Sequence, residues 1–143
     1  MKSKASARWE GDLTQGRGHL DTASGVLRGT PYSYKTRFER ESGTNPEELI
    51  AAAHAGCFSM ALSMILGQGG FAVSKIETEA EVTLQKQGDG FAITQVHLEV
   101  QATVPGVTAE DFQTAAHEAK TGCPVSKVLN AEITMEARLI DIG

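Results

Sequence analysis

Residues 49–74 contain no Asp, Glu, Lys or Arg, and this uncharged run limits the possible fold more than any other feature. Just before it, Asn45 and Pro46 precede two glutamates. That order is typical of a helix N-terminus, because Asn caps the helix, Pro fits its first turn and acidic groups interact favourably with its dipole. Glycines at 67, 69 and 70 supply a stop signal. We predict a long apolar helix from residue 46 to about residue 66.

A helix without a charged side has to be covered all round, whereas a helix packed on one sheet needs a single apolar stripe. Residues 49–66 just reach the length of a membrane span, about 18 residues. They include His54 and two serines, however, and the rest of the chain alternates like a soluble protein, so a buried helix is favoured. Small residues recur at four-residue spacing, as from Ala52 to Gly56. We predict a homodimer with two such helices at its centre; a monomer burying its helix is the alternative.

The rest of the chain alternates like a soluble α/β protein, and its length of 143 residues suits a single domain, residues 1–143. Alternation in residues 32–39 places the aromatic side chains on one face of a strand and Arg37 on the other. Gly88 and Gly90 predict a hairpin turn. The expected strands lie at 5–10, 18–22, 32–39, 76–86, 91–104 and 131–140, and the further helices at 109–120 and 124–129.

The net charge argues against several classes of partner, and the N-terminal residues indicate the compartment. A net charge of −5 and a pI near 5.3 argue against nucleic acid and against an anionic membrane surface. Residues 1–9 have no apolar segment of the secretory kind, so we expect a cytoplasmic protein. In that compartment two cysteines are unsuited to a stable structural disulfide, but a transient catalytic disulfide is possible.

The two cysteines occupy different settings. Cys57 lies within the apolar helix, where it is either an inert buried thiol or a nucleophile that needs a nearby cation, because apolar surroundings oppose a thiolate. His54, three residues earlier, is on the same helix face and is either such a partner or an ordinary core histidine. Cys123 precedes Pro124 and would cap a helix, where backbone N–H groups favour a thiolate; it is equally a plain capping residue.

Other chemistries lack their motifs. The cysteines form no CxxC pair, and the histidines have no metal-ligand spacing. There is no phosphate-binding glycine loop and no GxSxG motif. Thiol chemistry or no chemistry remains.

Two segments closely resemble the OsmC/Ohr family of thiol-dependent hydroperoxidases. Residues 44–62, TNPEELIAAAHAGCFSMAL, resemble the first cysteine motif of that family, and residues 122–126, GCPVS, resemble the second. Flanking segments at 9–11, 36–38 and 131–134 are also similar, so that the resemblance spans nearly the whole chain. His54 is the variant typical of the OsmC branch. Gly56 stands where relatives commonly have alanine, a departure that loosens the helix without removing a functional group.

This resemblance implies an α+β fold, in which antiparallel sheets wrap two long central helices in an intertwined homodimer. It also implies a peroxidase for organic hydroperoxides, and more weakly for hydrogen peroxide, in oxidative or osmotic stress defence. Cys57 matches the peroxidatic cysteine, Cys123 the resolving cysteine, Arg37 the arginine that stabilises the thiolate, and Glu47 the glutamate that orients this arginine. The reductant that the resemblance implies is a dithiol of lipoyl type, and no flavin, haem or metal is implied.

Helical spacing adds a geometric expectation. Glu47 and Cys57 are ten residues apart, about 15 Å along a helix. One arginine would hardly reach both within a subunit, so we expect an active site shared across the dimer interface. Two alternatives stay open: a thiol-disulfide oxidoreductase or redox sensor that uses Cys123, and a non-enzymatic dimeric protein that binds hydrophobic ligands.

Overall fold

The computed structural model describes residues 1–140. Their contacts group the chain into two compact units, one covering Met1–Leu49 and the other beginning at Ile50. Each unit is described by itself below. The assignment of residues 1–143 to a single domain stays a prediction.

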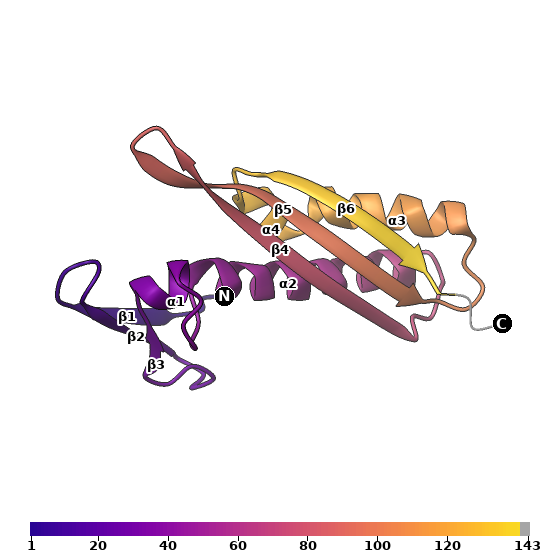
Figure 1. Ribbon diagram of the computed structural model, residues 1–143. Coiled ribbons are helices and arrows are strands. Elements are labelled where there is room, and N and C mark those ends of the chain that lie inside the picture. The colour runs from indigo at the N-terminus through magenta and orange to yellow at the C-terminus, as the bar shows by residue number, and fades with distance from the viewer. Residues whose placement is uncertain (141–143) are drawn as a thin grey trace. The chain divides into compact units, whose positions relative to one another are not determined.

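The N-terminal unit contains a three-stranded antiparallel sheet in the order β1-β2-β3 (Figure 1). Its strands are β1 (Ala5–Glu10), β2 (Arg17–Thr22) and β3 (Thr30–Tyr32). Gly18 of β2 lies beneath two aromatic rings, Trp9 and Tyr32, whose centroids are 5.5 Å apart. A Cβ atom at Gly18 would lie 2.4 Å from the Tyr32 ring and 2.7 Å from the Trp9 ring, so glycine is required for this close approach.

The strand predicted for residues 32–39 is wrong. Strand β3 ends at Tyr32, and residues Tyr34–Phe38 form helix α1. The cause is a capping box: the Ser33 hydroxyl accepts a hydrogen bond from the Thr36 backbone N–H (3.2 Å), and the Thr36 hydroxyl accepts one from the Ser33 N–H (2.8 Å). Arg37 therefore lies in the last turn of a short helix rather than on the outer face of a strand.

Helix α2 (Pro46–Gln68) begins where the sequence predicts and ends two residues later than expected. Asn45 caps it, because its side-chain oxygen accepts a hydrogen bond from the Glu48 backbone N–H at 2.8 Å. At the other end the Phe71 N–H bonds the Leu66 carbonyl (3.0 Å), while Gly70 has a φ of +89°. This left-handed glycine supplies the predicted stop.

The C-terminal unit holds a second sheet in the order β4-β5-β6. Along the sequence, helices α3 (Ala109–Gly122) and α4 (Pro124–Val128) lie between β5 and β6. The predicted hairpin is confirmed: β4 (Lys75–Gln87) and β5 (Gly90–Thr103) are antiparallel. Strand β6 (Glu132–Leu139), however, pairs parallel to β5. The expectation of purely antiparallel sheets is therefore wrong for β6, because the helical crossover returns the chain in the direction of β5.

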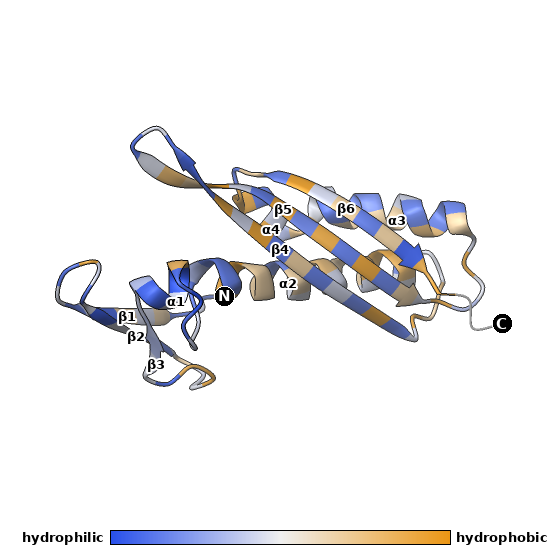
Figure 2. Ribbon diagram, viewed as in Figure 1, coloured by the Kyte–Doolittle hydropathy of each residue, from blue (hydrophilic) through white to orange (hydrophobic). Residues whose placement is uncertain are grey.

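One face of the second sheet carries the core. Figure 2 shows apolar and polar residues alternating along β5, as expected for a strand with one covered face. The apolar side is buried and packs with residues of α2 and α3 (Figure 1). The predicted helix over residues 109–120 is confirmed as α3, and it buries a stripe of four residues. The buried core residues of these elements are Val96, Leu98, Val100 and Ala102 of β5, Phe58, Leu62 and Leu66 of α2, and Phe112, Ala115, Ala116 and Ala119 of α3.

Helix α2 also carries large apolar side chains that the described chain leaves uncovered. Met60 is 76% exposed and Met64 58% exposed. By length and composition, Pro46–Gln68 is the one helix among residues 1–140 that qualifies as a membrane span, and 22% of its apolar window is buried. A core helix can have the same length and composition as a membrane span. Phe58, Leu62 and Leu66 of this helix belong to the core of the second unit. Met60 and Met64 therefore form an exposed apolar part of a helix whose opposite side belongs to the core.

Replacing Phe112 with alanine tests this core. Phe112 is fully buried, so Phe112→Ala should lower the free energy of unfolding by about 3–5 kcal/mol through lost burial and a residual cavity. The matched control is Phe91→Ala, at a side chain that is 59% exposed, with an expected loss below about 1 kcal/mol. Urea unfolding at one fixed protein concentration measures both changes. Equal losses would contradict the assigned core.

Candidate redox site

The second unit brings its two cysteines together. Cys57 comes from α2, and Cys123 is the residue that caps the N-terminus of α4. Their side chains interact with each other, and the Cys57 thiol also makes a hydrogen bond with the Val125 backbone. Both cysteines are free thiols; Cys123 is fully buried, whereas Cys57 is partly exposed. The predicted cap is confirmed, since the Cys123 sulfur accepts a hydrogen bond from the Ser126 N–H at 3.3 Å.

The surroundings of Cys57 oppose its ionisation. Burial is the largest cause that raises the pKa of the Cys57 thiol, and the neighbouring Cys123 raises it further, while the hydrogen bond with the Val125 backbone acts in the opposite direction. A raised thiol pKa lowers the thiolate fraction at neutral pH. Reactivity at this sulfur therefore requires a cation beyond the groups that act on it here.

His54 is part of the same site, but through a different contact from the one considered in the sequence. Its Nε2 lies 2.7 Å from the Ser126 hydroxyl oxygen, which in turn lies 3.2 Å from the Cys123 sulfur. His54 is fully buried, and burial lowers the pKa of its imidazole, so the neutral ring is favoured. The three side chains form a continuous line from α2 to the cysteine of α4. Sequence reasoning missed Ser126, although its position three residues after the capping Cys123 was an available signal.

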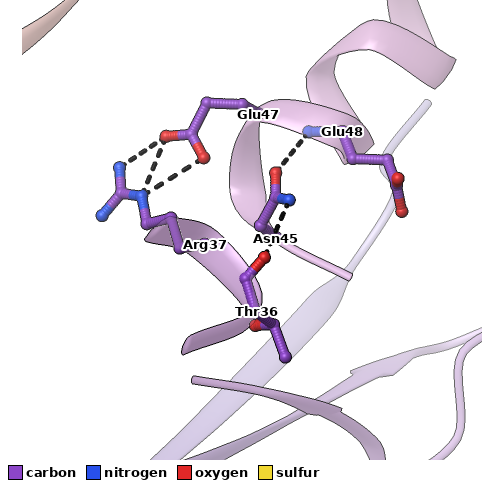
Figure 3. A network of polar contacts seen from close by, with 5 residues as sticks. All are labelled: Thr36, Arg37, Asn45, Glu47 and Glu48. Carbon is purple, nitrogen blue, oxygen red and sulfur yellow. Dashed lines mark hydrogen bonds and ion pairs between the residues drawn. The ribbon is translucent and has the colours of Figure 1, made fainter. Parts of the chain in front are cut away.

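Arg37 and Glu47 form a pair in the N-terminal unit, as Figure 3 shows. The Arg37 Nε donates hydrogen bonds to both carboxylate oxygens of Glu47, at 3.0 and 3.2 Å, and Nη2 contacts Oε1. The Glu47 side chain is 11% exposed and that of Arg37 35%. The Asn45 amide holds this region together by donating to the Thr36 carbonyl at 3.3 Å (Figure 3). The guanidinium is thus oriented by Glu47 while part of it stays accessible.

An apolar cavity of about 270 Å³ lies beside Arg37 within the same unit. Most of its lining is aromatic or aliphatic, and Arg37 supplies its cationic group. Such a hollow can hold a small organic molecule whose polar end faces the guanidinium. The residues that line it are Trp9, Leu13, Tyr32, Ser33, Tyr34, Arg37, Phe38 and Pro46.

One group in the described chain has metal-ligand chemistry: His97, Glu99 and Glu136 on the second sheet. The two ring nitrogens of His97 already bond the Thr134 hydroxyl (2.6 Å) and the Glu99 carboxylate (2.9 Å). The hydrogen bond from His97 is the largest cause that lowers the pKa of Glu99. The cluster is therefore accounted for as a surface hydrogen-bond network.

The four predicted site residues thus fall into two pairs. Arg37 contacts Glu47, and Cys57 contacts Cys123. The first pair belongs to the N-terminal unit and the second to the C-terminal unit. The catalytic roles assigned to the four residues stay predictions.

The chain is similar to proteins of one known family, both in sequence and in fold. Residues 39–138 match the family model described as OsmC-like protein. Peroxiredoxin OsmC of Escherichia coli K12 is 54% identical over 139 residues, which are 97% of each chain. Organic hydroperoxide resistance protein OhrA of Bacillus subtilis is 32% identical and covers 82% of this chain and 78% of that protein. The crystal structure of OhrB of Bacillus subtilis superimposes with a TM-score of 0.73 at 27% identity, covering 96% and 98% of the two chains.

The fold and the site define a two-sheet α+β protein with a pair of neighbouring free thiols. Together with the family match and the full-length similarity, they show that the chain belongs to the OsmC-like protein family. The predicted resemblance to OsmC and Ohr proteins is confirmed.

The contact between the cysteines predicts a disulfide under mild oxidation. Treatment with diamide should remove both free thiols of each wild-type chain by forming an intramolecular bond, since the sulfurs already interact. Thiol titration and mass spectrometry of non-reduced peptides measure the product. Cys57→Ser is the control and should yield no intramolecular bond. A wild-type product linked only between chains would contradict the geometry.

Proposed function

We propose that this protein is a cysteine-based peroxidase that reduces organic hydroperoxides, and hydrogen peroxide more weakly, as part of a stress response. The observation that carries the proposal is the contact between a partly exposed thiol, Cys57, and a buried thiol, Cys123. The names of the relatives, a peroxiredoxin and an organic hydroperoxide resistance protein, support the same chemistry. The chemistry needs no flavin, haem or metal, because sulfur carries the electrons.

In the first step the Cys57 thiolate attacks one oxygen of the hydroperoxide. The oxygen–oxygen bond breaks, an alcohol leaves, and Cys57 becomes a sulfenic acid. Arg37 is the cation that the Cys57 thiolate requires; it also stabilises negative charge on the leaving oxygen. Its tether to Glu47 fixes the direction of the guanidinium, and Arg remains charged in surroundings where Lys would lose its proton.

In the second step Cys123 attacks the Cys57 sulfenic acid, and the disulfide forms with release of water. An external dithiol, of lipoyl type, then reduces the disulfide and restores both thiols. The different exposures of the two cysteines support this order, since a partly exposed sulfur meets the peroxide more easily than a fully buried one. They also disfavour the alternative in which Cys123 is the primary nucleophile.

The preference for organic substrates has two supports. The helix that carries Cys57 is uncharged from residue 49 to its end at Gln68. The apolar cavity beside Arg37 offers a place for an alkyl or aryl group, whose burial contributes roughly 0.8 kcal/mol per methylene. A cytoplasmic location is part of the proposal and rests on the sequence alone.

The active protein is a homodimer in this proposal. The exposed methionines of α2, Met60 and Met64, would be covered by the same helix of a second copy. Every residue of β1 is exposed as well, which suits a strand that wraps a partner. The helical spacing between Glu47 and Cys57 suits an active site in which Arg37 of one subunit serves the other.

A peroxidase assay with cumene hydroperoxide and dihydrolipoamide tests the reaction. Cys57→Ser should abolish turnover, and Cys123→Ser should stop after one oxidation of Cys57. Arg37→Ala should slow the oxidation of Cys57 by about a hundredfold, the effect of removing one group that stabilises transition-state charge. Arg28→Ala is the matched control at an exposed arginine and should keep the wild-type rate. A Cys57→Ser variant with undiminished turnover would exclude the mechanism.

The dimer is tested by charging its proposed centre. Met60→Lys combined with Met64→Lys should shift the protein from dimer to monomer, because two buried ammonium groups would face their copies. Val26→Lys is the control, since Val26 is 83% exposed and lies outside the helix. Sedimentation velocity measures the assembly, and peroxidase activity should fall with dissociation. A monomeric wild-type protein at micromolar concentration would remove this part of the proposal.

A further inference from the structure

A line of three polar side chains leads from the buried cysteine to a buried histidine. The Cys123 sulfur and the Ser126 hydroxyl oxygen are 3.2 Å apart, and this oxygen is 2.7 Å from His54 Nε2. Sulfur also accepts the Ser126 backbone N–H at 3.3 Å, which fixes the serine beside it. A hydroxyl can donate one hydrogen bond while it accepts another, so Ser126 can connect the thiol to the imidazole.

His54 is not explained by a structural role alone. Its side chain is fully buried, and Nδ1 has no hydrogen-bond partner among the described residues. A structural buried histidine normally satisfies both ring nitrogens, since an unpaired one costs about 1–3 kcal/mol. Here the single polar contact of the ring is directed at Ser126, and through it at Cys123.

We propose that His54, acting through the hydroxyl of Ser126, accepts the proton of the Cys123 thiol when Cys123 attacks oxidised Cys57. The inference rests on the proposed function in one respect, the resolving role of Cys123. His54 is a positioning and proton-accepting residue in this step, because it touches neither the substrate nor the reacting sulfur. Ser126 contacts the reacting sulfur directly.

The step balances in atoms and electrons. The thiol proton moves to the Ser126 oxygen as the hydroxyl proton moves to His54 Nε2, and this leaves a thiolate and an imidazolium. The sulfur of Cys123 then forms a bond with the sulfur of Cys57, while the sulfur–oxygen bond of the sulfenic acid breaks. Hydroxide leaves and becomes water by taking up one proton, which equals the proton that the thiol gave up. The relay returns to its starting state once His54 is neutral again.

The electrostatic setting suits a proton acceptor that is neutral at rest. The titratable groups of this site are Cys57 on the same helix and Cys123 at the start of α4. At this step Cys57 is oxidised and carries no thiolate charge, and Cys123 is the thiol whose proton is transferred. Burial is the cause that lowers the pKa of His54, with no contribution from a charged group. Neutral His54 is therefore present above its lowered pKa, and the relay is lost only when the pH falls through that value.

The test needs no hydroperoxide. Cys57 is first converted to its mixed disulfide with thionitrobenzoate in a buffer acidic enough to protonate His54, which stops the relay. The protein is then mixed into buffers between about pH 6 and 9, which bracket the usual histidine and thiol pKa values. Attack by Cys123 forms the disulfide and releases the coloured thionitrobenzoate anion. Stopped-flow absorbance follows this release in the wild type and in His54→Gln, Ser126→Ala, Ser126→Thr and Ser59→Ala.

The wild-type rate should stay nearly constant with pH up to the thiol range, because the proton moves within the site. In Ser126→Ala and His54→Gln the rate should be roughly tenfold or more lower near pH 6.5 and should rise about tenfold per pH unit. Glutamine keeps a hydrogen-bonding group at this position but cannot take the proton, so it separates the relay from a structural role. Ser126→Thr keeps the hydroxyl and should restore the flat profile.

Ser59→Ala is the matched control, because it also removes a hydroxyl that bonds another hydroxyl, that of Thr78 at 2.7 Å. It should behave as wild type. A wild-type rate that rises tenfold per pH unit, an unaltered profile in His54→Gln, or equal slowing in Ser59→Ala would each overturn the relay. If the relay profile is found in a protein that reduces no hydroperoxide, the peroxidase proposal fails and the relay stands.

Discussion

Ionising a sulfur within an apolar helix is the physical problem on which this site depends. Burial raises the pKa of Cys57, yet apolar surroundings also favour binding of an organic substrate, whose alkyl or aryl group gains from burial. The helical spacing of α2 leaves Cys57 partly buried and partly accessible. His54, Phe58 and Leu62 follow one another at four-residue spacing and are all buried, whereas Met60 and Met64 are exposed. Cys57 projects between these two faces, where it packs against the core and remains partly accessible.

Local signals in the sequence predicted most of the fold. The start of α2 follows from Asn45 and Pro46, and the hairpin of β4 and β5 from Gly88 and Gly90. The failure at residues 32–39 has a specific cause. Alternation of aromatic and charged residues favoured a strand, but the paired Ser33 and Thr36 hydroxyls satisfied the backbone of a helical turn. A five-residue helix shows too little periodicity to compete with such a pattern.

Contacts between residues far apart in the chain were harder to predict from the sequence. The spacing of β5, α3 and α4 gave no signal that β6 would lie parallel to β5, because strand direction depends on how the helical crossover packs. Likewise, His54 and Ser126 are 72 residues apart and meet only through the fold. The pairing of Cys57 with Cys123 could be expected from family resemblance, whereas the contact of His54 with Ser126 is evident only from the three-dimensional structure.

In the proposed cycle the two thiols face opposite demands, and their surroundings differ. A peroxidatic thiolate must persist before substrate arrives, so it needs a permanent charge such as Arg37, which Glu47 holds in place. A resolving thiol must stay unreactive until its partner is oxidised, and complete burial of Cys123 keeps its sulfur away from solvent and from the hydroperoxide. A neutral acceptor reached through Ser126 fits the second demand, because it removes the proton only while the disulfide forms. A fixed cation beside Cys123 would instead keep the buried sulfur ionised throughout the cycle. The hydrogen-bonded line from Cys123 through Ser126 to His54 therefore agrees with a thiol that loses its proton only during the resolving step.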